Sequence, residues 1–487
     1  MIKHFKSKII VAFSLILALA SCTKDFETIN VDPNKPTAVP STNSLGYALS
    51  DFTSNFYDMW MDANESSYAN QLGKIQYVDE SRYAFREGVI NAAFATVYRD
   101  LQNLKQIEKD ADANKKVNMK AAAMTYSAFI WQMATDTWRD IPFTDAINAE
   151  GSAISPKYDT QETIYPAVMK MLADANDLFN QKATDALGTG DFLFKGDLTK
   201  WQKFANSVRL RMAIRISNVD PTTAKKVVEE ILGNPTKYPV ISSNDENAFF
   251  NWSGKSPYQE IFYEDKYVSS RDDHGVCSVL IDQLKAFNDP RISVYAKPAT
   301  NDGVYRGVIA GVHQSTFKMD DISRMGTRFR DNAAGFSPYV RYSEVLFLKA
   351  EAAQRGWSAG ITAKDAYSAA ITASLAENGI DAIAIATYLA QSTVAYNNTL
   401  DQIYLQKWIS LFKQGHEAWA ETRRTDVPKL GVAPTSAYPG HNRPPFREPY
   451  PTNEYSLNAD NIGPYWAKAT DRLWGQQMWW DTRTGVK

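Results

Sequence analysis

One pattern in the chain could place a catalytic serine. Residues 356–360 (GWSAG) match the G-x-S-x-G motif, in which the serine sits on a strained turn between a strand and a helix. Here a predicted helix precedes the motif and another follows it, so we expect an ordinary turn. Gly254-Lys255-Ser256 lacks the upstream glycine of a phosphate-binding loop. The five histidines contain no pair at metal-ligand spacing: His4, His274, His313, His416 and His441.

Two acidic pairs, Asp136/Asp140 and Asp272/Asp273, are candidate glycosidase carboxylates. An arginine is adjacent in sequence to a member of each pair, which favours structural ion pairing. No catalytic constellation remains, so we expect a protein that is not an enzyme and needs no cofactor. Whether a metal is bound is left open by the sequence.

A cysteine near the N-terminus stands in a context for lipid attachment. Three lysines precede an uncharged apolar run at residues 9–20, which is too short to anchor across a bilayer but is typical of a secretory signal. The segment Leu19-Ala20-Ser21-Cys22 then resembles the bacterial lipobox, in which the cysteine receives a diacylglycerol and becomes the first mature residue. The alternative is an ordinary cleaved signal with a chance cysteine. We expect Cys22 to be lipidated.

Aromatic residues make up 12% of the chain and supply candidates for ligand binding. Tyr and Trp combine a flat apolar face, which can pack on the C–H face of a sugar, with a polar edge. Core packing explains any single ring better than ligand contact does, but at least one of the six is expected to face a ligand. The candidates are Trp252, Tyr258, Tyr263 and Tyr267, with Trp60 and Tyr68 opposing them.

Two further groups of polar residues have competing interpretations. Asp272, Asp273 and His274 are candidates for a polar site beside a ligand or an ion, and the alternative is a solvated loop. Adjacent side chains of an extended segment point to opposite sides, so only one of the two aspartates should reach the ligand. Three arginines share one predicted apolar helix, and we expect them to form mainly structural ion pairs: Arg209, Arg211 and Arg215.

These residues must be positioned by a body in which helical periodicity dominates. Residues 120–138 are Ala-rich and aromatic without Gly or Pro, which predicts a buried helix. Residues 343–357 and 363–377 predict a helical hairpin with alanines at the contact, as in a tetratricopeptide-like unit. Residues 400–421 predict the longest helix. No clean 34-residue repeat is present elsewhere.

The pattern predicts three parts of the chain. Residues 1–21 are expected to be a signal peptide, and residues 22–45, rich in Pro and Asn, an extended tether. The body, 46–487, is expected to be mainly α, with few short strands. Its expected parts are a helical scaffold at about 46–233 and 339–427, an irregular ligand-binding region at about 234–338, and a wrapping tail at about 428–487.

Composition excludes several classes of partner. Without the three lysines of the signal, the chain has 50 basic and 55 acidic residues and no long block of one sign, which argues against nucleic acid. No second apolar run is long enough to span a bilayer, so membrane contact is expected through the lipid alone. If Cys22 is lipidated, Cys277 is left without a disulfide partner.

Several segments resemble one family, the SusD/RagB outer-membrane lipoproteins of the Bacteroidetes, in the branch described as SusD-like and starch-binding. They follow one another along nearly the whole chain. These segments are Cys22–Phe26, Asn30–Asn34, Asp136–Ala146, Tyr158–Tyr165, Gly196-Asp197, Trp201, Phe204–Arg211, Asn288–Arg291, Ala350–Ala353, Gln406–Trp408, Gly415–Trp419, Arg423–Thr425 and Trp479–Asp481.

The resemblance implies a mainly α protein with tetratricopeptide-like hairpins, anchored by lipid to the cell outer membrane and exposed at the surface. It also implies a SusC-like TonB-dependent transporter as partner. The implied cargo is an oligosaccharide or polysaccharide, with a peptide as the other possibility. Ligand-contacting residues vary within the family and cannot be transferred by motif.

We therefore expect a non-catalytic lipoprotein that captures a nutrient, most of all a glycan, and delivers it to the transporter. Two alternatives stay open, namely a surface glycoside hydrolase and a helical-repeat scaffold that binds only proteins. The absence of a catalytic set disfavours the first alternative, and the long aromatic loop region disfavours the second.

Overall fold

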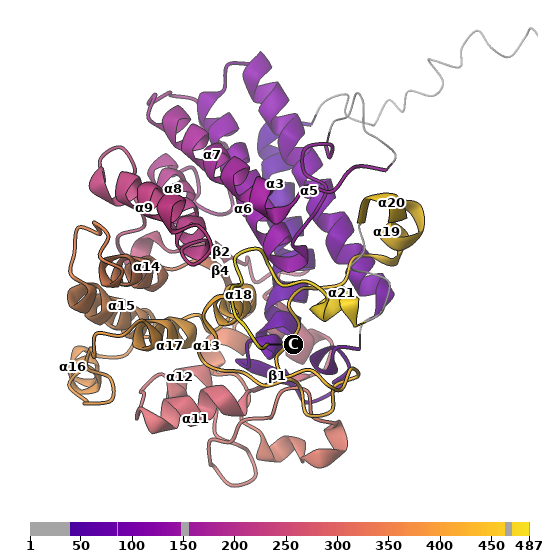
Figure 1. Cartoon of the computed structure of the whole chain (residues 1–487), viewed down its shortest axis with the longest axis vertical. Coiled ribbons are helices and arrows are strands. Elements are labelled where there is room, and N and C mark those ends of the chain that lie inside the picture. The colour runs from indigo at the N-terminus through magenta and orange to yellow at the C-terminus, as the bar shows by residue number, and fades with distance from the viewer. Residues whose placement is uncertain (1–38, 85, 148–154, 463–469, 487) are drawn as a thin grey trace, which may run out of the picture. The chain divides into compact units, whose positions relative to one another are not determined.

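The computed structural model describes residues 39–84, 86–147, 155–462 and 470–486, without the side chains of residues 59–63. The expected signal peptide, Cys22 and most of the expected tether lie outside these ranges. The chain divides into two units, 1–40 and 41–487, and only the second is described below (Figure 1). Among the described residues, no helix is long and apolar enough to cross a membrane.

The first half of the second unit is a row of helices in which each packs against the next along the chain (Figure 1). Their N-termini are capped by side chains where the sequence allows it. The Thr160 hydroxyl accepts from the amide of Thr163, and the Asp197 carboxylate accepts from that of Lys200. The helices are α3 (Ser41–Phe52), α5 (Glu87–Ala113), α6 (Val117–Trp138), α7 (Gln161–Phe179), α8 (Leu198–Arg215) and α9 (Pro221–Gly233).

The second helical group contains the predicted hairpin. α14 (Tyr342–Gln354) and α15 (Ala363–Glu377) pack closely together, and residues 356–360 form the turn between them. Gly356 and Gly360 have φ of +77° and +70°, which suits glycine. The GWSAG pattern is thus a helix–helix turn, not a strand–helix elbow. The mainly α fold is confirmed.

The segment predicted as the longest helix is two helices, which corrects that expectation. α17 (Leu400–Ser410) ends before Lys413, whose φ is +65°, and α18 (Gly415–Thr425) begins at Gly415. The buried Lys413 ammonium donates to the Glu260 carboxylate at 2.7 Å and to the carbonyl of Phe336 at 2.6 Å. These long-range contacts hold the break. The longest helix in the described ranges is α5.

Short elements fill the region between the two helical groups. Two antiparallel pairs of strands form there, one joining β1 to β3 and the other β2 to β4. Outside these strands, Val308 makes an isolated bridge to Cys277. The strands are β1 (Leu72–Lys74), β2 (Ala248–Asn251), β3 (His274–Val276) and β4 (Phe336–Val340).

The remaining elements are short helices and one further helix of the second group. They are η1 (Thr53–Glu65), α4 (Ser66–Tyr68), η2 (Glu80–Arg82), η3 (Asn244–Glu246), α10 (Ile261–Tyr263), η4 (Glu264–Val268), α11 (Ser278–Ala286), α12 (Ile292–Tyr295), η5 (Gln314–Thr316), η6 (Met319–Asp321), α13 (Thr327–Arg330), α16 (Ala382–Leu389), α19 (Thr452–Leu457), α20 (Ala459–Ile462) and α21 (Asp471–Trp474).

The C-terminal tail runs across α18 and α6 with little regular structure (Figure 1). The carbonyl of Pro445 accepts from the Trp419 indole at 3.2 Å, and the amide of Glu448 donates to the carbonyl of Thr137 at 2.9 Å. The buried Trp480 indole donates to the Asp136 carboxylate at 2.9 Å. These bonds fix the tail on the helical body.

Buried ion pairs join α8 to α14 and α18, as the arginine spacing predicted. The Arg211 guanidinium donates to both carboxylate oxygens of Glu344, at 2.6 and 2.8 Å. Arg215 pairs with Glu417 and with Glu421, and Arg209 pairs with Glu230 at 2.7 Å. A buried charge is costly unless it is paired, so these contacts fix the relative placement of the three helices.

Candidate functional site

The pairing of β1 with β3 brings two loops together. The pair has Leu72 opposite Val276 and Lys74 opposite His274, and the amide of Ile75 continues it by donating to the carbonyl of Asp273 at 2.7 Å. Tyr77 lies on the loop that follows β1, and Arg271 lies on the loop that precedes β3. The Arg271 guanidinium lies 4.7 Å from the centroid of the Tyr77 ring, within the range of a cation–π contact.

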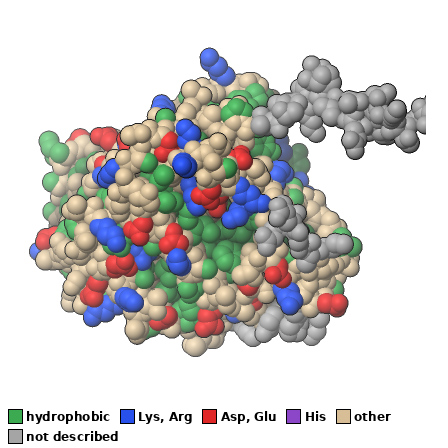
Figure 2. Space-filling view, turned by 90° about the horizontal axis from the view of Figure 1, so that it is seen from above, with side chains coloured by type: hydrophobic (Ala, Val, Ile, Leu, Met, Phe, Trp, Pro, Cys, Tyr) green, Lys and Arg blue, Asp and Glu red, His purple; other side chains and the backbone are tan. Residues whose placement is uncertain are grey.

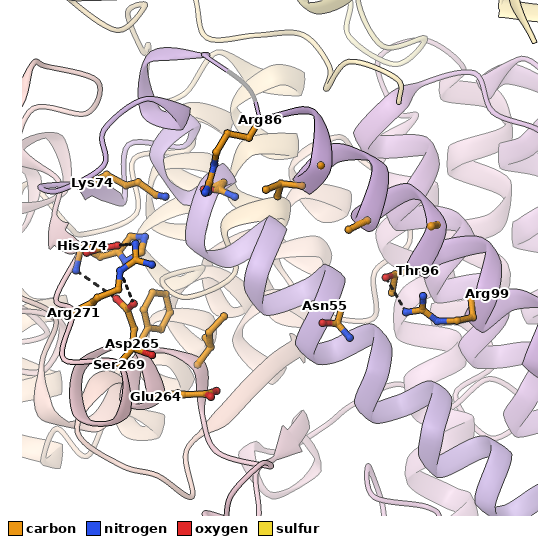
Figure 3. A pocket seen from close by; sticks show the side chains of 18 residues that line it. Asn55, Lys74, Arg86, Thr96, Arg99, Glu264, Asp265, Ser269, Arg271 and His274 are labelled. Atoms are coloured by element: carbon orange, nitrogen blue, oxygen red, sulfur yellow. Dashed lines mark hydrogen bonds and ion pairs between the residues drawn. The ribbon is translucent and has the colours of Figure 1, made fainter. Parts of the chain in front are cut away.

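Beside this pair lies a cleft with a volume of about 770 Å³. One wall is the first half of α5, where Gly88, Ala92 and Ala95 follow helical spacing and leave room because their side chains are small. The opposite wall is the segment from Ile261 to His274. Figure 3 shows Arg271 and Asp265 at one end, Arg99 and Thr96 at the other, and Asn55 of η1 between them.

Both π-helical segments of the described chain border this cleft. η1 contributes Asn55 and Asn64, and η4 contributes Glu264 and Asp265. Tyr77 and Ser270, on the two facing loops, have φ of +50° and +54°, which is uncommon outside glycine. Wide helical turns and strained residues concentrate at functional sites. Their gathering around one cleft marks it as the candidate site.

The charged groups of the cleft are held by fixed partners. Lys74 donates to Glu80 at 3.2 Å, and Arg86 pairs with the same carboxylate. Burial alone would raise the pKa of Glu80, but these two cations lower it below its usual value. Burial and the nearby Asp273 raise the pKa of Asp265.

At the other end, the Arg99 Nε donates to Asp51 at 3.0 Å, and its guanidinium also donates to the Thr96 hydroxyl at 3.0 Å. The neighbouring buried Asp100 has a pKa raised to about 9, mainly by burial and also by Asp51. This end therefore presents Arg99 to the cleft, with Asp51 as its carboxylate partner.

The three polar candidates divide between the cleft and its surroundings. Asp273 and His274 line the cleft, and both are largely buried. Asp273 pairs with Arg271, and the His274 ring lies edge-on to Phe262. Asp272 does not line the cleft. Its carboxylate accepts from Arg324 and Arg330, each at 2.9 Å.

Two of the aromatic candidates are on the segment that forms the charged wall. The rings of Tyr263 and Tyr267 pack together with centroids 4.8 Å apart, and the Lys266 ammonium lies 4.4 Å from the Tyr267 ring. Neither ring lines the cleft itself. Tyr267 is 50% exposed and lies in sequence between the lining residues Asp265 and Ser269. Tyr258 is also exposed, in a separate turn closed by a bridge to Lys255.

Two other aromatic candidates are core residues. The Trp252 indole donates to the Ser337 hydroxyl at 2.9 Å and packs against Phe250. Tyr68 packs edge-on against Tyr83 and Trp419. In this conformation neither presents a ring face to solvent. Trp60 lies in η1 between the cleft residues Asn55 and Asn64, but its side chain is outside the described residues.

Sequence reasoning missed Tyr77, Arg86 and Arg99. Arg271 was assigned only a structural role, as a partner for the adjacent aspartates. The cleft depends on the pairing of two three-residue strands, which are too short to show period-two alternation. A usable signal was the small-residue spacing of Gly88, Ala92 and Ala95 beside Arg99. In the described ranges, no group of three or more His, Cys, Asp or Glu residues is placed to hold a metal ion.

Residues 33–451 match the family described as SusD-like, starch-binding and associating with the outer membrane. The chain belongs to this SusD-like family. A comparison with curated protein sequences gave no match.

Solved structures of SusD homologues have the same fold. A homologue from Bacteroides uniformis is 23% identical, with a TM-score of 0.78 over 90% of this chain and 99% of that one. A chitin-binding homologue from Flavobacterium johnsoniae is 22% identical, with a TM-score of 0.76 over 91% and 98% of the two chains. A SusD-like protein from Bacteroides thetaiotaomicron is 22% identical, with a TM-score of 0.78 over 92% and 100%.

Proposed function

We propose that this SusD-like protein is a non-catalytic surface lipoprotein that captures a glycan in the cleft beside α5. One observation carries the proposal. An open cleft lined by polar and charged side chains, one of which (Arg271) packs on the 63% exposed Tyr77 ring, occurs in a chain whose family is described as starch-binding. Sugar hydroxyls need such polar partners, and a tyrosine ring offers a face for the sugar's C–H groups.

A binding role without catalysis is supported by the state of the acidic residues. Asp136 accepts hydrogen bonds from Gln132, Tyr165 and Trp480 in the core. Asp272 is held by two arginines away from the cleft. Neither predicted pair presents two free carboxylates to a common space, which glycoside hydrolysis requires.

The protein would be attached to the outer membrane by a lipid and would deliver its glycan to a transporter. The lipobox-like segment ending at Cys22 supports a lipid anchor, and the family description supports association with the outer membrane. A protein held there can pass its cargo to a TonB-dependent transporter, which we propose as its partner. Of the sequence candidates, Asp273 and His274 remain proposed as ligand-binding residues because they line the cleft. Tyr263 and Tyr267 remain proposed as supporting residues because they lie on the segment that forms one wall.

The test is affinity electrophoresis of the purified protein through gels that each contain one polysaccharide, including glycol chitin, soluble starch and pectin. Glycan capture predicts retarded migration in at least one gel, and incubation with that polysaccharide should release no reducing ends. Unretarded migration in every gel would contradict glycan capture. Release of reducing ends would instead favour the hydrolase.

A further inference from the structure

Each arginine of the cleft is paired with an aspartate or glutamate whose side chain is less exposed than that of the arginine. The side chain of Arg86 is 66% exposed and that of its partner Glu80 is 4% exposed. Arg271 is 46% exposed and pairs with Asp273, which is 2% exposed. Arg99 is 43% exposed, and its partner Asp51 is 13% exposed. In each pair the carboxylate lies behind the guanidinium, which presents its remaining N–H groups to the solvent side.

The ionic surface that a ligand can reach is therefore mostly guanidinium. Of the three acids that line the cleft, Asp273 is buried, Asp265 is half-buried, and only Glu264 is exposed. Glu80 is shared between Lys74 and Arg86, which leaves one positive charge in excess at that point, whereas Arg271 is paired with two carboxylates, Asp273 and Asp265. On the face seen in Figure 2, positive and negative side chains are interspersed. Attraction to an anion would thus be local and not a property of the whole surface.

The arginines are also spread along the cleft. Arg86 directly precedes α5 and Arg99 lies thirteen positions later, which corresponds to about 20 Å along the helix axis. Arg271 lies on the facing wall. A single small anion cannot reach all three guanidinium groups, whereas a chain with anionic groups along its length can. A guanidinium group can bind two oxygens of a planar carboxylate, or two oxygens of a tetrahedral oxyanion such as a sulfate ester, through paired charge-assisted hydrogen bonds.

We propose that the cleft selects glycans carrying anionic groups along the chain, either uronate carboxylates or sulfate esters. This rests on the proposed function of glycan capture and names the class of glycan. Arg86, Arg99 and Arg271 bind the anionic groups, while the small-residue stripe of α5 leaves room for the sugar rings.

The test is isothermal titration calorimetry with four oligosaccharides of equal length: a galacturonan, a sulfated galactan, a chitin fragment and a starch fragment. At least one anionic probe should bind about tenfold or more tightly than both neutral probes, since a charge-assisted hydrogen bond contributes about that factor. Its affinity should fall as salt is raised. The two anionic probes together show whether carboxylate or sulfate is the recognised group.

Arg86→Gln is the main variant, because Glu80 keeps Lys74 as a partner and the fold should be retained. This substitution should lower the affinity for the anionic probe about tenfold and change the affinity for the neutral probes little. Arg271→Lys, which keeps the charge but loses the paired geometry, should also weaken the anionic probe. Arg306→Gln is the control, because Arg306 is also an exposed arginine, at 43%, and is ion-paired to Asp302, but does not line the cleft.

Tighter binding of a neutral probe, with no effect of Arg86→Gln, would overturn the selection of anionic glycans and leave glycan capture standing. Absence of binding by all four probes, together with unretarded migration in every polysaccharide gel, would overturn both.

Discussion

Tyr77 and Arg271 are in cation–π contact across two facing loops, with the guanidinium of the cleft residue Arg271 4.7 Å from the centroid of the Tyr77 ring. The two loops are brought together by the pairing of β1 with β3. Tyr77 keeps a left-handed backbone and a largely exposed ring, a combination that folding alone does not favour. The guanidinium covers part of the ring and fixes its orientation. We propose that the Tyr77 ring packs against the sugar.

Tyr77→Ala should weaken binding of the captured oligosaccharide about three- to tenfold, the range expected for loss of an aromatic contact. The melting temperature should change little because the ring is exposed. Tyr258→Ala is the control, since Tyr258 is similarly exposed, at 54%, and lies outside the cleft. Calorimetric titration of both variants decides the matter. Equal affinities for the two variants would remove Tyr77 from the site.

Arg211→Ala should lower the free energy of unfolding by about 3–5 kcal/mol, because it leaves the Glu344 carboxylate buried without its main partner. The exposed pair of Lys170 and Asp174 on α7 provides the contrast, and Lys170→Ala should cost about 0.5 kcal/mol or less. Urea denaturation measures both changes. A similar, small effect of the two substitutions would show that the α8 pair does not hold the helices together.

Glu448 should make the fold less stable as pH rises. Burial raises the pKa of this carboxyl to about 8, whereas an unfolded glutamate titrates near 4.3. Between about pH 4.3 and pH 8 the folded state therefore holds a proton that the unfolded state has lost, so the contribution of Glu448 to stability is complete below about pH 4.3 and is lost as the pH rises to about 8. Nearby Glu65, whose pKa burial also raises, shares this titration.

Glu448→Gln removes the ionisable group but keeps its shape. Denaturation midpoints measured from pH 5 to pH 8 should show the variant gaining stability relative to wild type as pH increases. A constant difference between the two proteins across this range would mean that the Glu448 carboxyl does not titrate in the folded state.

Cys22→Ala should move the protein from the membrane fraction to the soluble fraction of cells, because the lipid on this residue is the proposed anchor. Immunoblots of fractions washed with high salt measure the distribution. A variant that stays with the membrane after the wash would be held by something other than the lipid, and the lipoprotein proposal would fail.

Local patterns predicted much of the scaffold. The spacing over residues 120–138 corresponds to α6, and the alanine-rich pair 343–357 and 363–377 corresponds to α14 and α15. The break at Lys413 could not be predicted, because it depends on a buried contact with Glu260, far away in the sequence. Propensity over residues 400–421 gives no sign of that contact.

The candidate site was only partly predictable for the same reason. Asp273 and His274 were chosen for their chemistry and do line the cleft. Trp252 and Tyr68 were chosen equally well on chemistry but are core residues, since residue type does not distinguish a buried ring from an exposed one. Tyr77 becomes notable only when β1 and β3 are paired. Long-range strand pairing, which single residues do not encode, creates the cleft.

If the glycan occupies the cleft beside α5, a large side chain placed in that cleft should block glycan binding. Ala92 is exposed and lines the cleft, whereas Ala113 is exposed at the far end of the same helix. Ala92→Trp should fill the cleft, and Ala113→Trp should leave it open. Both variants would be titrated with the oligosaccharide that binds wild-type protein most tightly. We predict that Ala92→Trp lowers the affinity for this oligosaccharide at least tenfold, whereas Ala113→Trp keeps the wild-type affinity. Wild-type affinity in a folded Ala92→Trp variant would contradict it.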